Sequence, residues 1–158
     1  KTIGRTKVDA MAERLKEINP TCEVETRNSR FSSVASVPSF SSFSLVVDAI
    51  DSVDCKAELI LGATEAGVPL VSSMGAALRF DPTKVKVTRF EKVEGDGLAR
   101  ALRHRFREQG RALPKFPCVW SAEPPLALES RGSVMTVTAT FGMCLAATAI
   151  NLLIGENK

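Results

Sequence analysis

Apolar residues near the start of the chain recur with the period of a helix. Within residues 4–20, the spacing i, i+3, i+4, i+7 of one helical face is followed by Val8, Met11, Ala12, Leu15 and Ile18. Asn19-Pro20 ends this pattern, and the alternation in residues 22–26 predicts a short strand. Residues 27–44 are rich in serine and predict a loop or a poorly specified helix.

The middle of the chain predicts a strand, a helix and a second strand. Residues 45–50 are apolar except for Asp48, which is typical of a parallel strand covered on both faces. Ser52 can cap a helix over residues 53–67, and residues 68–73 form the next apolar run. This order predicts a βαβ unit and an α/β fold.

The second half of the chain contains four recognisable segments. Residues 84–90 alternate and predict a strand with one solvated face, and residues 96–110 predict a basic helix. Residues 111–132 are expected to be irregular because five of these 22 residues are Pro or Gly. Residues 134–155 predict a strand, a turn at Phe141-Gly142 and a helix rich in small residues.

Composition excludes few classes of protein. The 158 residues suit one domain, and a net charge of +3 is too small to demand a nucleic-acid partner. None of the four cysteines lies in a C-x-x-C pair, which disfavours a zinc ribbon and favours reduced thiols in a cytoplasmic protein. The uncharged residues 133–155 are long enough for a membrane span, but their threonines favour a buried core helix, so membrane association is not expected.

Two carboxylates stand at the end of the first predicted central strand. Ligands of open α/β sheets bind beyond the carboxyl ends of the strands, where Asp51 lies. A carboxylate there suits magnesium, which is commonly held by one or two carboxylates and substrate phosphates. The alternative is that Asp51 only caps the helix. Asp48, inside the strand, requires a polar partner if it is buried.

Several of these segments, taken together, resemble a known family. Residues 48–110, "DAIDSVDCKAELILGATEAGVPLVSSMGAALRFDPTKVKVTRFEKVEGDGLARALRHRFREQG", are similar to the second half of the tRNA threonylcarbamoyladenosine dehydratases. "KVDAMAERLKEINP" and "TVTATFG" resemble the same family in the same order. These enzymes belong to the ThiF/MoeB/HesA group, relatives of ubiquitin-activating enzymes. The resemblance implies a Rossmann-like, mostly parallel sheet flanked by helices.

The resemblance also implies a reaction and site residues. In this superfamily ATP converts a carboxylate into an acyl-adenylate. In the dehydratases this carboxylate is the threonyl carboxylate of N6-threonylcarbamoyladenosine in tRNA, and loss of AMP closes a ring. The aspartate that assists magnesium and the phosphates corresponds to Asp51, beside Ser52. The lysine that neutralises the triphosphate corresponds to Lys7, which would otherwise be an ordinary solvated lysine.

The chain departs from the family pattern at its start. The glycine-rich turn G-x-G-x-x-G that cradles the nucleotide is absent from the sequence, so we expect residues 1–158 to be a partial ThiF-type domain, the C-terminal portion of a longer enzyme. Residues 27–44 stand where the family has an acidic crossover segment, and no cysteine shortly precedes "TATFG".

The basic helix offers a nucleic-acid surface. One helical face is expected to carry Arg100, Arg103, Arg107 and Arg111. This face is either merely solvated or contacts tRNA phosphates. Two other functions stay open: an adenylyltransferase for a ubiquitin-like sulfur carrier, and a non-catalytic dimerisation or binding module. The resemblance also implies a homodimer and makes a sulfur-relay protein a candidate partner.

Overall fold

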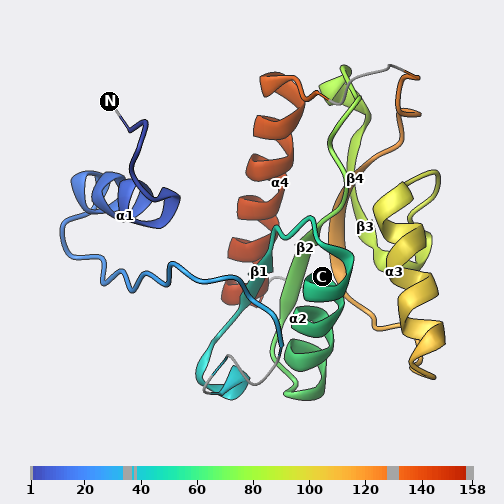
Figure 1. Cartoon of the computed structure of the whole chain (residues 1–158), viewed down its shortest axis with the longest axis horizontal. Helices are drawn as coiled ribbons and strands as arrows, with labels where there is room; N and C mark the ends of the chain where they lie inside the picture. Colours follow the sequence, from blue (N-terminus) through green and yellow to red (C-terminus); the bar gives the residue numbers. More distant parts are fainter. Residues whose placement is uncertain (1, 34–36, 38, 128–131, 156–158) are drawn as a thin grey trace. The chain divides into compact units, whose positions relative to one another are not determined.

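The computed structural model describes residues 2–33, 37, 39–127 and 132–155. The chain divides into two compact units, Lys1–Phe31 and Ser32–Lys158 (Figure 1).

The first unit contains helix α1 (Lys7–Ile18). The helix begins where the sequence predicts, because the Thr6 hydroxyl accepts a hydrogen bond from the Asp9 backbone N–H at 3.2 Å. No residue of α1 is buried. The strand predicted over residues 22–26 is wrong: these residues form no strand. A strand requires a hydrogen-bonded neighbour, and the described part of this unit supplies none.

A four-stranded sheet forms the centre of the second unit. Its strands are β1 (Val46–Asp48), β2 (Leu70–Ser73), β3 (Val85–Arg89) and β4 (Pro117–Ser121), in the order β1-β2-β4-β3. The pairs β1–β2 and β2–β4 are parallel, whereas β3 runs antiparallel to β4. The predicted mostly parallel sheet and the βαβ unit are therefore confirmed.

Strand β4 corrects the prediction that residues 111–132 are irregular. Pro117 occupies its first position, where a proline is tolerated, and Cys118, Val119 and Trp120 behind it are buried. The density of prolines around this segment hides a strand that lies between two others.

Helices cover both faces of the sheet. Helices α2 (Val53–Glu65) and α3 (Gly97–Glu108) pack against each other, and α2 contacts β1 and β2 (Figure 1). Helix α4 (Met135–Ile154) crosses β2, β3 and β4. Val71 packs with α4 while its neighbour Ser72 bonds to Asp48 on the α2 side, so the two helical layers lie on opposite faces.

Three short 3-10 helices complete the described elements, at Phe40–Ser42, Pro82–Lys84 and Phe90–Lys92. The first of them lies in the serine-rich segment predicted as a loop or a poorly specified helix, of which residues 34–36 and 38 lie outside the described residues. Phe40 is buried against Gly62 of α2, where an added Cβ would lie 2.5 Å from a ring carbon.

Helix α4 is continuous, so the predicted strand and the turn at Phe141-Gly142 are wrong. The threonines favoured the strand interpretation, but their hydroxyls bond to carbonyls one turn earlier, for example Thr140 to Thr136 at 2.8 Å. Burial of Val137, Phe141 and Leu145 on one face outweighs the strand propensity of β-branched residues.

Only one face of α4 meets the expectation of a buried core helix. Met135, Met143, Ile150, Leu153 and Ile154 are exposed in the chain. By length and composition α4 could cross a membrane, but core helices of soluble proteins pass the same test. These two properties alone do not indicate a membrane protein.

Candidate active site

A buried ion pair lies at the carboxyl end of β1. Asp48 accepts hydrogen bonds at Oδ2 from Lys56 Nζ and from the Ser72 hydroxyl, each at 2.6 Å. Its Oδ1 accepts from the Ile50 backbone N–H at 3.0 Å. Lys56 also donates to the Ile50 carbonyl at 3.0 Å. The polar partner that buried Asp48 requires is therefore Lys56, to which the sequence had assigned no role.

The buried surroundings of this pair disfavour charged side chains. Both residues are 0% exposed, and burial lowers the pKa of Lys56, while the Asp48 carboxylate acts in the other direction. A buried ion pair contributes little net stability unless its remaining polar atoms are satisfied. Here the bonds to Ser72 and Ile50 satisfy several of them and fix the geometry.

Asp51 and Ser52 occupy the turn between β1 and α2. Asp51 is exposed, and Ser52 is the half-buried residue before the helix. The predicted capping contact is wrong in its detail, since Ser52 holds the N-cap position but its side chain makes no capping hydrogen bond. An exposed carboxylate next to a helix N-terminus can hold a phosphate group together with a cation.

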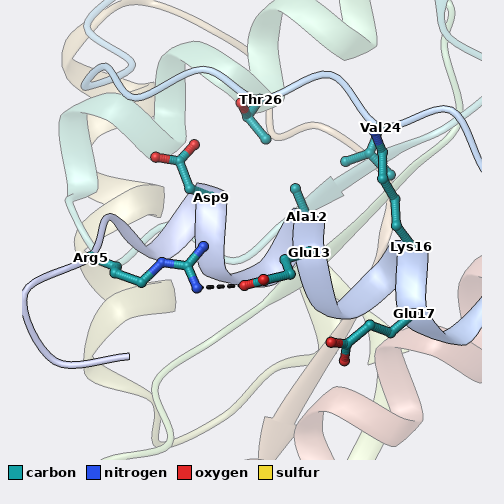
Figure 2. Close-up of a pocket in the computed structure, with 8 residues that line it drawn as sticks. All are labelled: Arg5, Asp9, Ala12, Glu13, Lys16, Glu17, Val24 and Thr26. Atoms are coloured by element: carbon teal, nitrogen blue, oxygen red, sulfur yellow. Dashed lines mark hydrogen bonds and ion pairs between the residues drawn. The ribbon is translucent and has the colours of Figure 1, made fainter. Parts of the chain in front are cut away.

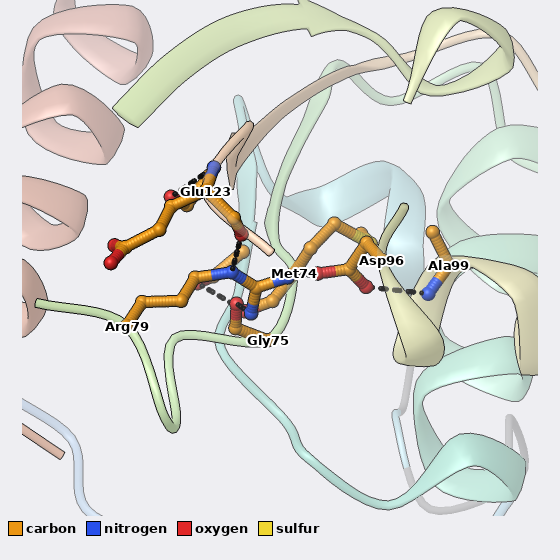
Figure 3. Close-up of polar contacts among 8 residues, drawn as sticks. Met74, Gly75, Arg79, Asp96, Ala99 and Glu123 are labelled. Atoms are coloured by element: carbon orange, nitrogen blue, oxygen red, sulfur yellow. Dashed lines mark hydrogen bonds and ion pairs between the residues drawn. The ribbon is translucent and has the colours of Figure 1, made fainter. Parts of the chain in front are cut away.

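A second buried cluster centres on Arg79, which follows β2 (Figure 3). Its Nη2 donates to Asp96 Oδ2 at 3.1 Å, its Nε to the Glu123 carbonyl at 3.1 Å, and its Nη1 to the Gly75 carbonyl. Asp96 in turn caps α3 by accepting from the Ala99 N–H at 2.9 Å. Arg79 thus fastens together the segments that follow β2 and β4 and the start of α3, at the same edge of the sheet as Asp51.

Lys7 is the exposed first residue of α1 and belongs to the first unit. A polar groove in this unit is shown in Figure 2 and contains an ion pair between Arg5 and Glu13. The groove is lined by Arg5, Asp9, Ala12, Glu13, Lys16, Glu17, Val24 and Thr26. Lys7 is not among these lining residues.

The four candidate arginines differ in their surroundings. Arg100 and Arg107 are exposed on α3. Arg103 points inward: its Nη2 donates to the carbonyls of Phe90 and Val93 at 2.8 and 2.7 Å. The placement of Arg111 on the same helical face is wrong, because α3 ends at Glu108. Arg111 instead forms an ion pair with Glu65 of α2 at 2.7 Å.

Cation binding at Asp51 would rest mainly on ligands from outside the protein. Within the described residues, no group of three or more His, Cys, Asp or Glu side chains could hold a metal ion. Magnesium fits such a site because it keeps several waters and binds through one or two carboxylates and substrate phosphates.

The Cys118 thiol is not an activated nucleophile. Cys118 is fully buried in β4, and burial raises the pKa of its thiol to about 12. A thiol with a raised pKa is protonated and unreactive at neutral pH.

Comparison with known proteins gives one consistent group. The model of the ThiF family matches residues 1–158. The tRNA threonylcarbamoyladenosine dehydratase of Bacillus subtilis is 35% identical over 128 residues, which are 80% of this chain and 50% of the relative. The Escherichia coli enzyme of the same name is 36% identical over 146 residues, which are 87% of this chain and 54% of that relative. The chain therefore spans about half the length of these relatives.

Solved structures agree with the sequence relatives. A crystal structure of the E. coli tRNA N6-threonylcarbamoyladenosine dehydratase in complex with AMP matches with a TM-score of 0.88 and 36% identity, covering 97% of this chain and 66% of that one. The same enzyme in complex with ATP matches with a TM-score of 0.87 and 36% identity, covering 97% of this chain and 65% of that one.

Proposed function

The chain belongs to the ThiF family, and on that premise we propose that it forms the Asp51-bearing part of an ATP-dependent tRNA threonylcarbamoyladenosine dehydratase. The observation that carries this proposal is the exposed Asp51 at the carboxyl edge of the mostly parallel sheet, held beside a helix N-terminus. The similarity to a dehydratase bound to ATP and AMP supports it.

The proposed reaction transfers AMP from ATP to the threonyl carboxylate of the modified adenosine with release of pyrophosphate, and then closes a ring with loss of AMP. Asp51 would hold magnesium, with Ser52 and the start of α2 next to it in the chain. Lys7 would supply a positive charge to the triphosphate. Bound magnesium would supply positive charge where the phosphates carry negative charge. Pre-organised charge of this kind stabilises the transition state without reorganisation during the reaction.

Asp51→Asn tests the magnesium role. The exposed side chain can be changed without disturbing the core, so we expect unchanged thermal unfolding. Because a neutral amide is a poorer cation ligand than a carboxylate, we expect Mg²⁺–ATP binding, measured by calorimetry, to be at least about tenfold weaker. The matched control is Asp54→Asn, an exposed carboxylate three residues later whose Oδ1 pairs with Arg105 at 3.1 Å.

Equal Mg²⁺–ATP affinity of the two variants and the unchanged chain contradicts the proposal. Complete absence of Mg²⁺–ATP binding favours the alternative of a non-catalytic module. ATP–pyrophosphate exchange then identifies the acceptor, since stimulation by tRNA carrying threonylcarbamoyladenosine supports the dehydratase and stimulation by a sulfur-carrier protein supports the adenylyltransferase.

Two partners complete the proposal. For tRNA, the exposed Arg100 and Arg107 make direct phosphate contacts, while Arg103 and Arg111 add positive charge nearby with their guanidinium groups already engaged. For a second copy of the chain, the support is the exposed apolar side of α4, including Met143 and Ile150. A tRNA substrate also agrees with a cytoplasmic location.

A further inference from the structure

We propose that Lys56 is a positioning residue, which holds the peptide bond between Ile50 and Asp51 and thereby aims the Asp51 carboxylate at the nucleotide. The aim toward a nucleotide rests on the proposed function, whereas the holding of the turn rests on geometry alone.

Both backbone polar atoms of Ile50 are held by the same ion pair. Its N–H donates to Asp48 Oδ1 at 3.0 Å, and its carbonyl accepts from Lys56 Nζ at 3.0 Å. That carbonyl belongs to the peptide group that leads directly into Asp51. Rotation of this peptide, which would swing Asp51 away, therefore breaks the bond from Lys56.

The ion pair is in turn fastened to the sheet and to the helix. Ser72 of β2 donates to Asp48 at 2.6 Å, and Lys56 extends from the first turns of α2. The turn over residues 49–52 is thus connected at its centre to a neighbouring strand and to the following helix. A connection of this kind can keep an exposed carboxylate in one orientation.

Stability alone does not explain why a lysine occupies this place. Both side chains are 0% exposed, and apolar residues of similar volume can replace a buried ion pair with little loss of stability. An apolar pair cannot hold the Ile50 carbonyl. The bond to this carbonyl is therefore the contribution that requires a long side chain with a donor at its end.

The double variant Asp48→Asn/Lys56→Met separates positioning from folding. It removes both charges together, the introduced asparagine can still accept from the Ile50 N–H, and the introduced methionine fills the space of the lysine stem. We expect amide hydrogen exchange in residues 50–53 to become at least about tenfold faster, while the amides of β2 and β4 keep their protection. Unchanged exchange in residues 50–53 overturns the inference.

A double-mutant cycle then tests the effect on Asp51. If Lys56 aims this carboxylate, Asp51→Asn should weaken Mg²⁺–ATP binding at least about tenfold in the unchanged chain and less than about threefold in the double variant. An equal loss in both backgrounds overturns the inference, because Lys56 is then only structural. No loss in the unchanged chain contradicts the proposed function instead, and hydrogen exchange alone decides whether Lys56 holds the turn.

Lys56→Gln provides a second test if the double variant fails to fold. Glutamine keeps a donor for Asp48 but is one bond shorter than lysine, so its amide no longer reaches the Ile50 carbonyl. The same faster exchange in residues 50–53 and the same reduced effect of Asp51→Asn are expected. The inference is overturned if amide hydrogen exchange in residues 50–53 and the effect of Asp51→Asn on Mg²⁺–ATP binding both equal those of the unchanged chain.

Discussion

Two ion pairs of nearly equal length show how differently charge is used at the sheet edge and on the outer helices. Lys56 and Asp48 lie 2.6 Å apart with 0% side-chain exposure, whereas Arg111 and Glu65 lie 2.7 Å apart with side chains 54% and 53% exposed. Water screens the second pair, so its expected contribution is only about 0–1 kcal/mol. Distance alone therefore says little about what an ion pair does.

The buried charges share a purpose that the exposed ones lack. Lys56 and Arg79 each donate to backbone carbonyls in the segments that follow strands, and each is paired with a buried carboxylate, Asp48 or Asp96. Their role is to fix turns at the carboxyl edge, where a ligand is expected. The exposed charges of α3 remain at the surface, where a partner can meet them.

The largest effect on stability is expected from breaking the buried pair on one side only. Lys56→Met leaves Asp48 as a buried charge without its cation, so we expect the free energy of unfolding in urea to fall by about 3–5 kcal/mol. Lys16→Met, a change of an exposed lysine on α1, serves as the control and should alter stability by less than about 0.5 kcal/mol. A loss of less than about 1 kcal/mol for Lys56→Met contradicts the difference between buried and exposed charges.

An intermediate effect is expected from Cys118, a buried group that stays neutral. Its pKa of about 12 lies above the ordinary value of 9.0, so above pH 9 the unfolded chain releases a proton that the folded chain keeps. Stability should therefore fall as the pH rises from 9 toward 12. The lowered pKa of Lys56 acts in the opposite direction, because the unfolded chain then binds more protons.

Cys118→Ala isolates the thiol contribution. Measured by urea unfolding under reducing conditions, the unchanged chain should lose about 1.4 kcal/mol more stability than Cys118→Ala between pH 8 and pH 10. Cys22→Ala changes an exposed thiol and should parallel the unchanged chain. If the free energy of unfolding of Cys118→Ala depends on pH in the same way as that of the unchanged chain, the raised pKa of Cys118 is contradicted.

Much of the fold could be predicted because its pattern is local. The βαβ unit and α3 follow from periodicity, whereas β4 and the continuous α4 were missed because tertiary packing outweighs Pro and Thr propensities. Asp51 was predicted as a site residue because ligands of open α/β sheets bind beyond the carboxyl ends of the strands. Lys56 had a signal in the sequence: it falls on the apolar face of α2 with Ile60, where a lysine must be buried. Arg79 lies in a loop, and no periodicity indicates its partners.

The smallest effect on stability, but a clear effect on binding, is expected from the exposed arginines of α3. Arg100→Glu/Arg107→Glu should change the free energy of unfolding by less than about 0.5 kcal/mol, because both side chains are solvated. Binding to tRNA, measured by fluorescence anisotropy at several salt concentrations, should weaken at least about tenfold and lose part of its salt dependence. Arg27→Glu/Arg89→Glu is the control for an equal change of net charge, because both arginines are exposed and pair at 2.9 Å with Glu25 and Glu91. Equal weakening by the control, or tRNA binding that does not depend on salt, contradicts a phosphate-contacting surface on α3, and the exposed charges would then serve only solvation.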